Sequence, residues 1–296
     1  MTDPPDRSHI ATELRNSKTH QLDALDTHAL VVLLSGDHHQ AISAVEDAAE
    51  PIAIFIDALA QRVKDGGRLI YLGCGTSGRL GVLDAAECPP TFQTDSSLVV
   101  GLIAGGDQAL RTSAEGEEDK HDGAFVALRE LEITALDTVL GIAAGGTTPW
   151  VLGGLNIAKE FGANTAFLTC SAEKPSCDHL IQLDTGPEPL TGSTRMKAAT
   201  ATKLTLNIIT TSLFTRLGKV HGNLMVDLHA SNDKLLDRAI RIVAHVCDLG
   251  REDATSVLRK ADWEVKTAIV MHRCQVDAEA ANSKLESAGG NLRAAL

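Results

Sequence analysis

Two glycine-rich loops that also carry hydroxyl groups are the residues of this chain best suited to bind an anion. The first, Gly73–Arg79, reads G-C-G-T-S-G-R and joins a short apolar run to a stretch with helical character. Glycines let the backbone turn sharply, so that its N–H groups can approach a ligand. The helix expected to begin there adds partial positive charge. We therefore predict an anion site at Gly75, Thr76 and Ser77.

The second loop, Ala143–Pro149, has the same order of small residues, hydroxyls and a proline suited to a first helical turn. Tight turns that need glycine would explain either loop alone, but they explain two hydroxyl-rich loops less well. We therefore predict that Gly146, Thr147 and Thr148 hold the same ligand from a second side.

Nucleotide-binding motifs are the main alternatives for the first loop. It is not a Walker A loop, because no G-K-[ST] follows. Gly73, Gly75 and Gly78 do match the bare spacing G-x-G-x-x-G, but no acid ends the next predicted strand, Leu98–Ala104, to hold a ribose. This spacing is therefore weak evidence for NAD.

Two glutamates could perform acid–base chemistry near these loops. Glu87 stands just before Pro89 and Pro90, which we expect to end a helix there. A carboxylate at the negative end of a helix is harder to ionise, and a raised pKa suits a general acid. The second candidate, Glu118, belongs to the acidic cluster Glu115–Asp119. From the residues alone, a solvated surface turn is the favoured interpretation of that cluster.

The composition excludes several classes of partner. Net charge is −12, from 39 acidic against 27 basic residues, so the chain has no general attraction for nucleic acid or anionic lipid. Any anion must be bound locally, by backbone amides and hydroxyls. The six cysteines form no C-x-x-C pair and the histidines form no H-E-x-x-H motif, so we predict reduced thiols and no metal site.

The N-terminal sequence does not resemble a targeting signal. Its first ten residues, MTDPPDRSHI, lack a basic segment followed by an apolar one. No apolar run is long enough to span a membrane. These features predict a cytoplasmic protein.

Short apolar runs alternate with helical stretches through the middle of the chain. This alternation predicts a parallel sheet covered by helices on both faces, with ligands bound beyond the carboxyl ends of the strands. The predicted strands are Arg68–Leu72, Leu98–Ala104, Thr138–Ala143, Thr165–Thr169 and Leu180–Leu183, and the clearest helices are Gln40–Val63, Pro149–Phe161 and Ser193–Leu217.

Helical segments flank this region on both sides. The first fifty residues have helical periodicity, and we interpret them as packing or dimer surface. After about Gly222 the pattern is helical throughout. Placing Glu252 on Glu279 also superposes Leu258 on Leu285, which indicates either two helix–turn–helix repeats or a chance similarity of Ala/Leu-rich helices.

Long strings of residues resemble one family. They are Gly75–Gly81 (GTSGRLG), Glu87–Thr91 (ECPPT), Glu115–Asp119 (EGEED), Thr12–Asn16 (TELRN), Thr191–Lys197 (TGSTRMK), Gly218–Asp227 (GKVHGNLMVD) and Gly289–Leu292 (GGNL). Together they closely resemble the N-acetylmuramic acid 6-phosphate etherases of the sugar isomerase (SIS) superfamily. In that family the second loop usually reads A-A-S-G-R-T-P-Y. This chain departs from the pattern at Gly145, where the family has serine, and at Thr147, where it has arginine.

The resemblance implies an architecture. It implies a three-layer α/β SIS domain of flavodoxin-like topology over residues 51–220, with a helical N-terminal arm (1–50) and a C-terminal helical bundle (221–296). Residues 288–292 (AGGNL) resemble the ubiquitin-associated three-helix fold, which we interpret as a packing element. The resemblance also implies a homodimer.

The resemblance also implies a reaction. Such enzymes are carbon–oxygen lyases of amino sugar catabolism. They cleave the lactyl ether of N-acetylmuramic acid 6-phosphate to N-acetylglucosamine 6-phosphate and D-lactate, without metal or organic cofactor. The resemblance implies that Glu118 is the base at C2 and that Glu87 protonates lactate and later activates water. It also implies that Ser193 and Arg195 bind the phosphate together with the two loops. A non-catalytic sugar-phosphate regulator and a sugar-phosphate isomerase are the alternatives.

Overall fold

The computed structural model describes residues 6–228 and 232–296, which form two compact units. The first unit comprises residues up to Ala86 together with Ser97–Ile209. The second comprises Glu87–Ser96 together with Thr210–Leu296. The division into arm, SIS domain and bundle at residues 50/51 and 220/221 stays a prediction, and residues 1–5 of the arm lie outside the described part.

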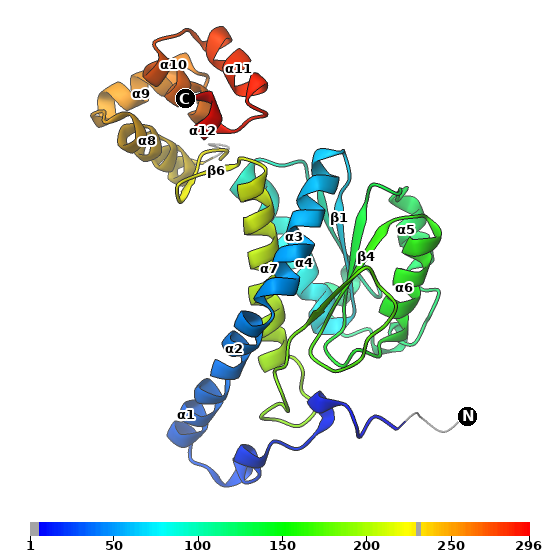
Figure 1. Ribbon diagram of the computed structural model, residues 1–296. Helices are drawn as coiled ribbons and strands as arrows, with labels where there is room; N and C mark the ends of the chain where they lie inside the picture. Colours follow the sequence, from blue (N-terminus) through cyan, green and yellow to red (C-terminus); the bar gives the residue numbers. More distant parts are fainter. Residues whose placement is uncertain (1–5, 229–231) are drawn as a thin grey trace. The chain divides into compact units, whose positions relative to one another are not determined.

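A five-stranded sheet forms the centre of the first unit (Figure 1). All its neighbouring strands are parallel, in the order β2-β1-β3-β4-β5, which is the flavodoxin-like order and confirms the predicted fold class. Every residue of β1 and β3 is buried, as expected for central strands covered on both faces. The strands are β1 (Leu69–Gly73), β2 (Val99–Ile103), β3 (Thr138–Ile142), β4 (Asn164–Thr169) and β5 (His179–Gln182).

Helices cover both faces of the sheet (Figure 1). One face carries α5 and α6. On α6, Trp150, Val151 and Leu155 are buried in one apolar cluster, which also contains Ile70 and Leu72 of β1. The other face carries α3, α4 and α7. Asp84 of α4 joins this second layer, because it accepts hydrogen bonds from the Tyr71 hydroxyl (2.9 Å) and the Asn207 amide (2.7 Å). The helices are α3 (Ala49–Lys64), α4 (Gly75–Phe92), α5 (Phe125–Glu130), α6 (Pro149–Glu160) and α7 (Lys197–Arg216).

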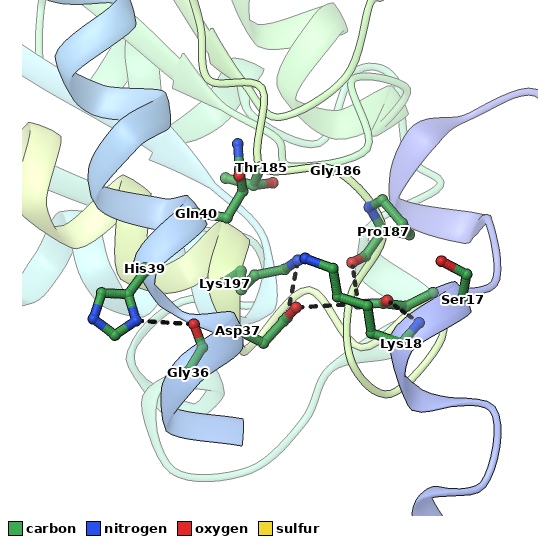
Figure 2. Close-up of a pocket in the computed structure, with 11 residues that line it drawn as sticks. Ser17, Lys18, Gly36, Asp37, His39, Gln40, Thr185, Gly186, Pro187 and Lys197 are labelled. Atoms are coloured by element: carbon green, nitrogen blue, oxygen red, sulfur yellow. Dashed lines mark hydrogen bonds and ion pairs between the residues drawn. The ribbon is translucent and has the colours of Figure 1, made fainter. Parts of the chain in front are cut away.

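The N-terminal arm consists of short helical turns followed by two helices. The single helix expected over Gln40–Val63 is wrong: the chain bends at Ala48 (φ −90°, ψ 11°), which separates α2 from α3. The arm is fixed to the start of α7 by the buried ion pair of Asp37 with Lys197 (2.9 Å; Figure 2). Its elements are the 3₁₀ turns η1 (Ala11–Glu13), η2 (Ser17–Thr19) and η3 (Leu22–Ala24), then α1 (Thr27–Asp37) and α2 (His39–Asp47).

Helix α4 does not end where its prolines led us to expect. It continues through Pro89 and Pro90 to Phe92, so the predicted end near Glu87 is wrong. Proline removes a helical N–H donor but does not prevent later turns from closing, and the Gln93 N–H donates to the Pro89 carbonyl (2.9 Å). Glu87 therefore lies in the body of the helix, and the argument from a helix terminus does not apply to it.

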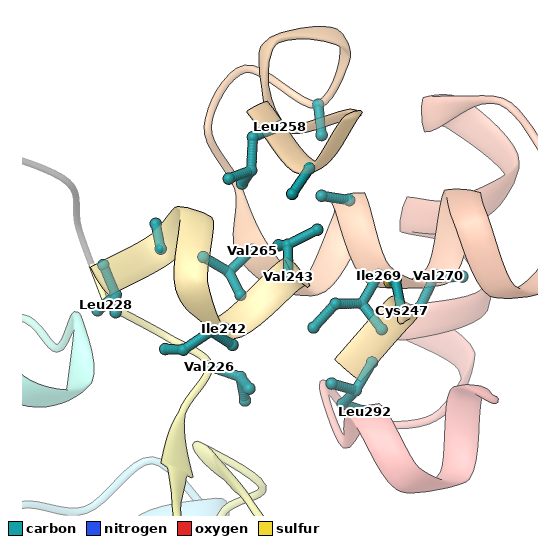
Figure 3. Close-up of a cluster of buried hydrophobic side chains, with 14 of the residues drawn as sticks. Val226, Leu228, Ile242, Val243, Cys247, Leu258, Val265, Ile269, Val270 and Leu292 are labelled. Atoms are coloured by element: carbon teal, nitrogen blue, oxygen red, sulfur yellow. The ribbon is translucent and has the colours of Figure 1, made fainter. Parts of the chain in front are cut away.

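After α7, the chain of the second unit forms a small hairpin, so the expectation of helices throughout the region after about Gly222 is wrong at its start. Strand β6 (Val220–His221) pairs antiparallel with β7 (Leu224–Met225). Five helices follow, and their apolar faces enclose one core that includes Val243, Leu258 and Ile269 (Figure 3). The helices are α8 (Asp233–Cys247), α9 (Arg251–Lys260), α10 (Val265–Cys274), α11 (Ala278–Ser287) and α12 (Leu292–Ala295).

The internal repeat is visible in the backbone of this unit. The alignment of Glu252 with Glu279 superposes the bounds of α9 on those of α11. It also superposes the two turns that follow: Asp262 and Trp263 have φ of 49° and 66°, and Gly289 and Gly290 have φ of 60° and 75°. These matching bounds and turns support the interpretation of two helix–turn–helix units with one apolar pattern.

No helix of the described residues is long and apolar enough to cross a membrane. Two further short helical turns, η4 (Asp107–Leu110) and η5 (Glu115–Glu117), lie between β2 and α5.

We expect Asp137→Asn to destabilise the protein by about 3 kcal/mol at pH 7, because a buried ion pair would lose one partner. Asp137 is 2% exposed and receives hydrogen bonds from Arg68 Nε (3.0 Å), Arg68 Nη2 (2.9 Å) and the Thr134 N–H (2.8 Å). Burial opposes ionisation, but these bonds and the Arg68 charge hold the pKa of Asp137 below its usual value. Urea unfolding of both proteins measures the difference.

The pH dependence of this difference has a defined sign. A carboxylate with a lowered pKa stabilises the fold above its unfolded-state pKa of about 3.9, and this stabilisation is lost as the pH falls through the folded-state pKa. The gap between wild type and Asp137→Asn should therefore narrow below about pH 4. A gap that stays constant down to pH 3 would contradict this account.

Candidate active site

A polar cavity of about 290 Å³ lies at the carboxyl ends of β1 and β3. This is the edge of a parallel sheet at which ligands usually bind. Loops after both strands, the Glu118 segment and α7 form its wall. The lining residues are Cys74, Gly75, Thr76, Ser77, Arg79, Ser113, Glu118, Ile142, Ala143, Ala144, Gly145, Thr148, Thr194, Ala199 and Thr202.

The first glycine loop turns directly from β1 into α4. Gly75 has φ of +50°, a backbone conformation that favours glycine. A Cβ on Gly73 would lie 2.5 Å from the Gly78 nitrogen, so strand and helix approach too closely for a side chain there. The first turn of α4 thus presents its amides and the hydroxyls of Thr76 and Ser77 to the cavity, a suitable environment for a phosphate group.

Glu118 lies against this first loop. A Cβ built on Gly75 would be 3.8 Å from Glu118 Oε1, so glycine leaves room beside the carboxylate. The Glu118 carbonyl accepts a hydrogen bond from the Trp150 N–H (2.9 Å), which fixes the acidic segment to the start of α6. Glu118 is half-buried and lines the cavity, so the solvated surface turn favoured from the residues alone is wrong for this side chain.

The thiol of Cys74 also lines the cavity, but its chemistry is suppressed. Burial raises the pKa of Cys74 to about 12, and the charge of Glu118 acts in the same direction. The protonated thiol is a poor nucleophile. The carboxylate of Glu118 is thus better placed than Cys74 to accept a proton from a ligand.

Side-chain hydroxyl groups donate hydrogen bonds to the backbone carbonyls of the second loop. Ser171 Oγ donates to the Gly145 carbonyl (3.0 Å) and Thr169 Oγ1 donates to the Ala144 carbonyl (3.3 Å). Gly146 is buried, with φ of +78°. Gly145 and Thr148 line the cavity, whereas Gly146 packs against Ser171.

The cavity contains some of the predicted site residues and not others. Gly75, Thr76, Ser77, Thr148 and Glu118 line it together. Five predicted residues are not among those that line it: Glu87, Gly146, Thr147, Ser193 and Arg195. Their roles stay predictions. Glu87 is exposed on α4.

Sequence reasoning missed several residues of the cavity. Arg79 is the only lysine or arginine among the described residues that line it, and it stands one helical turn after Thr76 within the predicted motif. Its Nε donates to the Leu110 carbonyl (3.2 Å), which orients the guanidinium. Position in the motif could have revealed Arg79, whereas nothing local marked Ser113 or Thr202.

The two adjacent glycines of the second loop should respond differently to alanine. A Cβ on Gly145 would meet only Thr12 Oγ1, at 3.9 Å, whereas one on Gly146 would lie 2.5 Å from Ser171 Oγ and from Glu173 Cβ. We expect Gly146→Ala to lower stability by about 1–3 kcal/mol because of overpacking and its positive φ. Gly145→Ala should change stability by less than about 0.5 kcal/mol. Thermal unfolding of both variants tests this, and equal losses would contradict it.

Within residues 6–228 and 232–296, no group of three or more His, Cys, Asp or Glu side chains could hold a metal ion.

Comparison with known proteins identifies the family. The chain is 48% identical to the N-acetylmuramic acid 6-phosphate etherase of Prochlorococcus marinus (strain MIT 9303) over 98% of this chain and 93% of that protein. It is 48% identical to the etherase of Nostoc sp. (strain PCC 7120) over 100% of this chain and 97% of that protein. The chain belongs to the N-acetylmuramic acid 6-phosphate etherase family.

Domain models and solved structures give further similarities. Residues 51–159 match the glucokinase regulatory protein N-terminal SIS domain, and residues 222–284 match the C-terminal lid domain of glucokinase regulatory protein. The chain is 18% identical to an E. coli CFT073 protein solved in complex with A5P, over 67% of this chain and 97% of that chain, with a TM-score of 0.48. It is 16% identical to a phosphoheptose isomerase from Neisseria gonorrhoeae, over 64% of this chain and 98% of that chain, with a TM-score of 0.46.

Proposed function

We propose that this etherase family member cleaves the D-lactyl ether of N-acetylmuramic acid 6-phosphate, giving N-acetylglucosamine 6-phosphate and D-lactate. The observation that carries the proposal is the Glu118 carboxylate beside the hydroxyl-rich first turn of α4. A phosphate at Gly75–Ser77, close to Arg79, would hold the sugar with its carbons facing Glu118. The full-length similarity to proteins named as this etherase supports the same substrate.

The chemistry is an elimination followed by a hydration. In the open-chain sugar the C1 aldehyde acidifies the C2 proton, which Glu118 removes. The C3–O bond then breaks, and lactate leaves with a proton from Glu87. Water adds back at C3 with Glu87 as base, and C2 recovers a proton. General acid–base catalysis by two carboxyl groups is sufficient for these proton transfers.

Release of D-lactate from N-acetylmuramic acid 6-phosphate by the purified protein tests the proposal. An enzymatic assay for D-lactate detects the product, and chromatography identifies the sugar phosphate. Binding without lactate would instead favour a regulator, the alternative suggested by the similarity to glucokinase regulatory protein domains. An isomerised sugar phosphate without lactate would favour an isomerase. Either result would overturn the proposal.

We also propose that the protein is a homodimer that associates through the arm. Helix α1 contains the apolar run Ala29–Leu34 and yet buries no residue, and it extends away from the sheet beyond α2 (Figure 1). Val31 and Val32 are 62% and 57% exposed. Exposed apolar patches of this kind mark interaction surfaces, and the occupant that we propose is a second copy of this chain.

The double substitution Val31→Glu/Val32→Glu should weaken self-association at least tenfold, since it places charges in an apolar contact. Sedimentation equilibrium measures the dissociation constant. Val126→Glu, on α5, is the matched control because Val126 is also 62% exposed. Equal association of both variants, or a monomeric wild type, would refute an interface at α1.

We propose a cytoplasmic location. All six cysteines are free, four of them buried, as is usual for proteins of a reducing compartment.

A further inference from the structure

A second cavity, of about 380 Å³, lies at the base of the N-terminal arm (Figure 2). It shares no lining residue with the Glu118 cavity. Its walls come from the segment around Asn16–Lys18, the junction of α1 and α2 at Gly36–Gln40, the loop Thr185–Pro187, and Lys197 at the start of α7. Its volume is within the range that small-molecule sites occupy.

One wall of this cavity is a buried charged network. The side chain of Lys197 is only 4% exposed, and its Nζ lies 2.9 Å from Asp37 Oδ2. The Asn16 amide donates to Asp37 Oδ1 (3.3 Å) and to the Pro187 carbonyl (3.2 Å). Asn16 is itself 6% exposed, and its Oδ1 accepts the Lys18 N–H (3.0 Å). These bonds fix the positions of the charged groups before any ligand arrives.

The side chain of Lys18 adds a second positive charge to this network. Figure 2 shows it extending into the cavity toward Lys197 and Asp37. Among the described residues, the only charged group within ion-pair distance of Lys197 is Asp37, and Lys18 has none. Two ammonium groups thus face Asp37, the one carboxylate among the described residues that line the cavity, and the nearby Glu188 carboxylate is bound by backbone N–H groups of α7. An anion that lay between the two ammonium groups would be attracted by both of them.

We propose that this cavity is a second anion site, which binds a phosphate or carboxylate group of a small metabolite between Lys18 and Lys197. The buried ammonium of Lys197 orients the anion, and the more exposed Lys18 closes on it from the arm. Asp37 limits the net charge, so the site favours a small anion over extended polyanions, in keeping with the acidity of the whole chain. The site does not depend on the proposed activity.

The position of this site connects it with the Glu118 cavity. Glu188, which is fully buried, accepts the N–H groups of Lys197 and Ala198 (2.9 Å each) and so fixes the first turn of α7. Ala199 and Thr202 on the same helix line the Glu118 cavity. An anion at Lys197 therefore lies within one or two helical turns of residues that contact the other ligand.

Isothermal titration with inorganic phosphate and, separately, with acetate tests the proposal. The full-length Thr76→Val/Ser77→Ala protein is the background, because these changes remove hydroxyl donors from the Glu118 cavity. In that background one of the two anions should still bind, and Lys18→Gln should weaken its binding at least tenfold. Lys64→Gln, which removes an exposed lysine of α3, should leave it unchanged.

Each outcome of the titrations either supports or overturns the proposed second anion site. Phosphate or acetate binding that depends on Lys18 and not on Lys64 supports the site and indicates which group it prefers. No measurable binding of either anion in the Thr76→Val/Ser77→Ala background overturns it, as does binding that both lysine variants reduce equally. Circular dichroism establishes that each variant is folded. Diffraction from crystals soaked in tungstate gives an independent measure, with an anomalous peak expected between Lys18 and Lys197.

Discussion

Glu118→Gln should lower the turnover number for D-lactate release by about 10²–10⁴-fold, the usual contribution of a general base. The amide has nearly the shape of the carboxylate, so the wall of the cavity beside Gly75 stays intact. Because the hydroxyls of Thr76 and Ser77, which we propose bind the phosphate, are unchanged, KM should stay within a few-fold of wild type. A large loss in kcat with a small change in KM is the signature of an interaction made in the transition state.

Exchange of the C2 proton separates this role from a structural one. Wild type incubated with the product sugar phosphate in D₂O should incorporate deuterium at C2, and Glu118→Gln should not. Glu117→Gln is the matched control, since Glu117 belongs to the same acidic segment but forms an ion pair with Lys120 (2.7 Å). If Glu118→Gln exchanged the proton at the wild-type rate, Glu118 could not be the C2 base.

Much of the sheet was predictable because its strands carry unambiguous local signals. β1 and β3 are short, mostly apolar runs (LIYLG and TVLGI), and the structure places them inside the sheet with every residue buried. The helix through Pro89 and Pro90 was not predictable in this way. Local propensity opposes this helix, whereas tertiary packing, such as that of Phe92 stacked on Phe214, favours it.

The same distinction applies to the cavity. Thr76 and Ser77 were predictable because the motif that contains them creates the local geometry by itself. Thr194 and Thr202 were not, because their approach to the loops depends on how α7 and the segment that precedes it lie against the sheet. Glu118 lies between these cases: its sequence context suggests a solvated turn, and the bond from the Trp150 N–H to its carbonyl brings it to the cavity.

Mixing Glu87→Gln with Glu118→Gln protein should restore activity that neither variant has alone. Each variant should lose about 10²–10⁴-fold in kcat, because each lacks one of the two carboxyl groups that we propose transfer protons. Glu87 is exposed and does not line the Glu118 cavity. Leu83, one turn earlier on the same face of α4, is 48% exposed, which suits a surface that contacts a second subunit.

If Glu87 of one subunit completes the cavity of the other, a mixed dimer contains one site with both mutations and one with neither. Free exchange of subunits makes half of the dimers mixed, so the mixture should show about a quarter of wild-type activity. If both glutamates served the same cavity within one chain, every site would lack one of them, and mixing would restore nothing. Co-refolded or subunit-exchanged samples, with each variant alone at the same total concentration, decide between these arrangements. The recovered fraction of activity reports the fraction of intact sites. It therefore tests both whether the protein is a dimer and whether Glu87 acts in the cavity of its own subunit or in that of the partner.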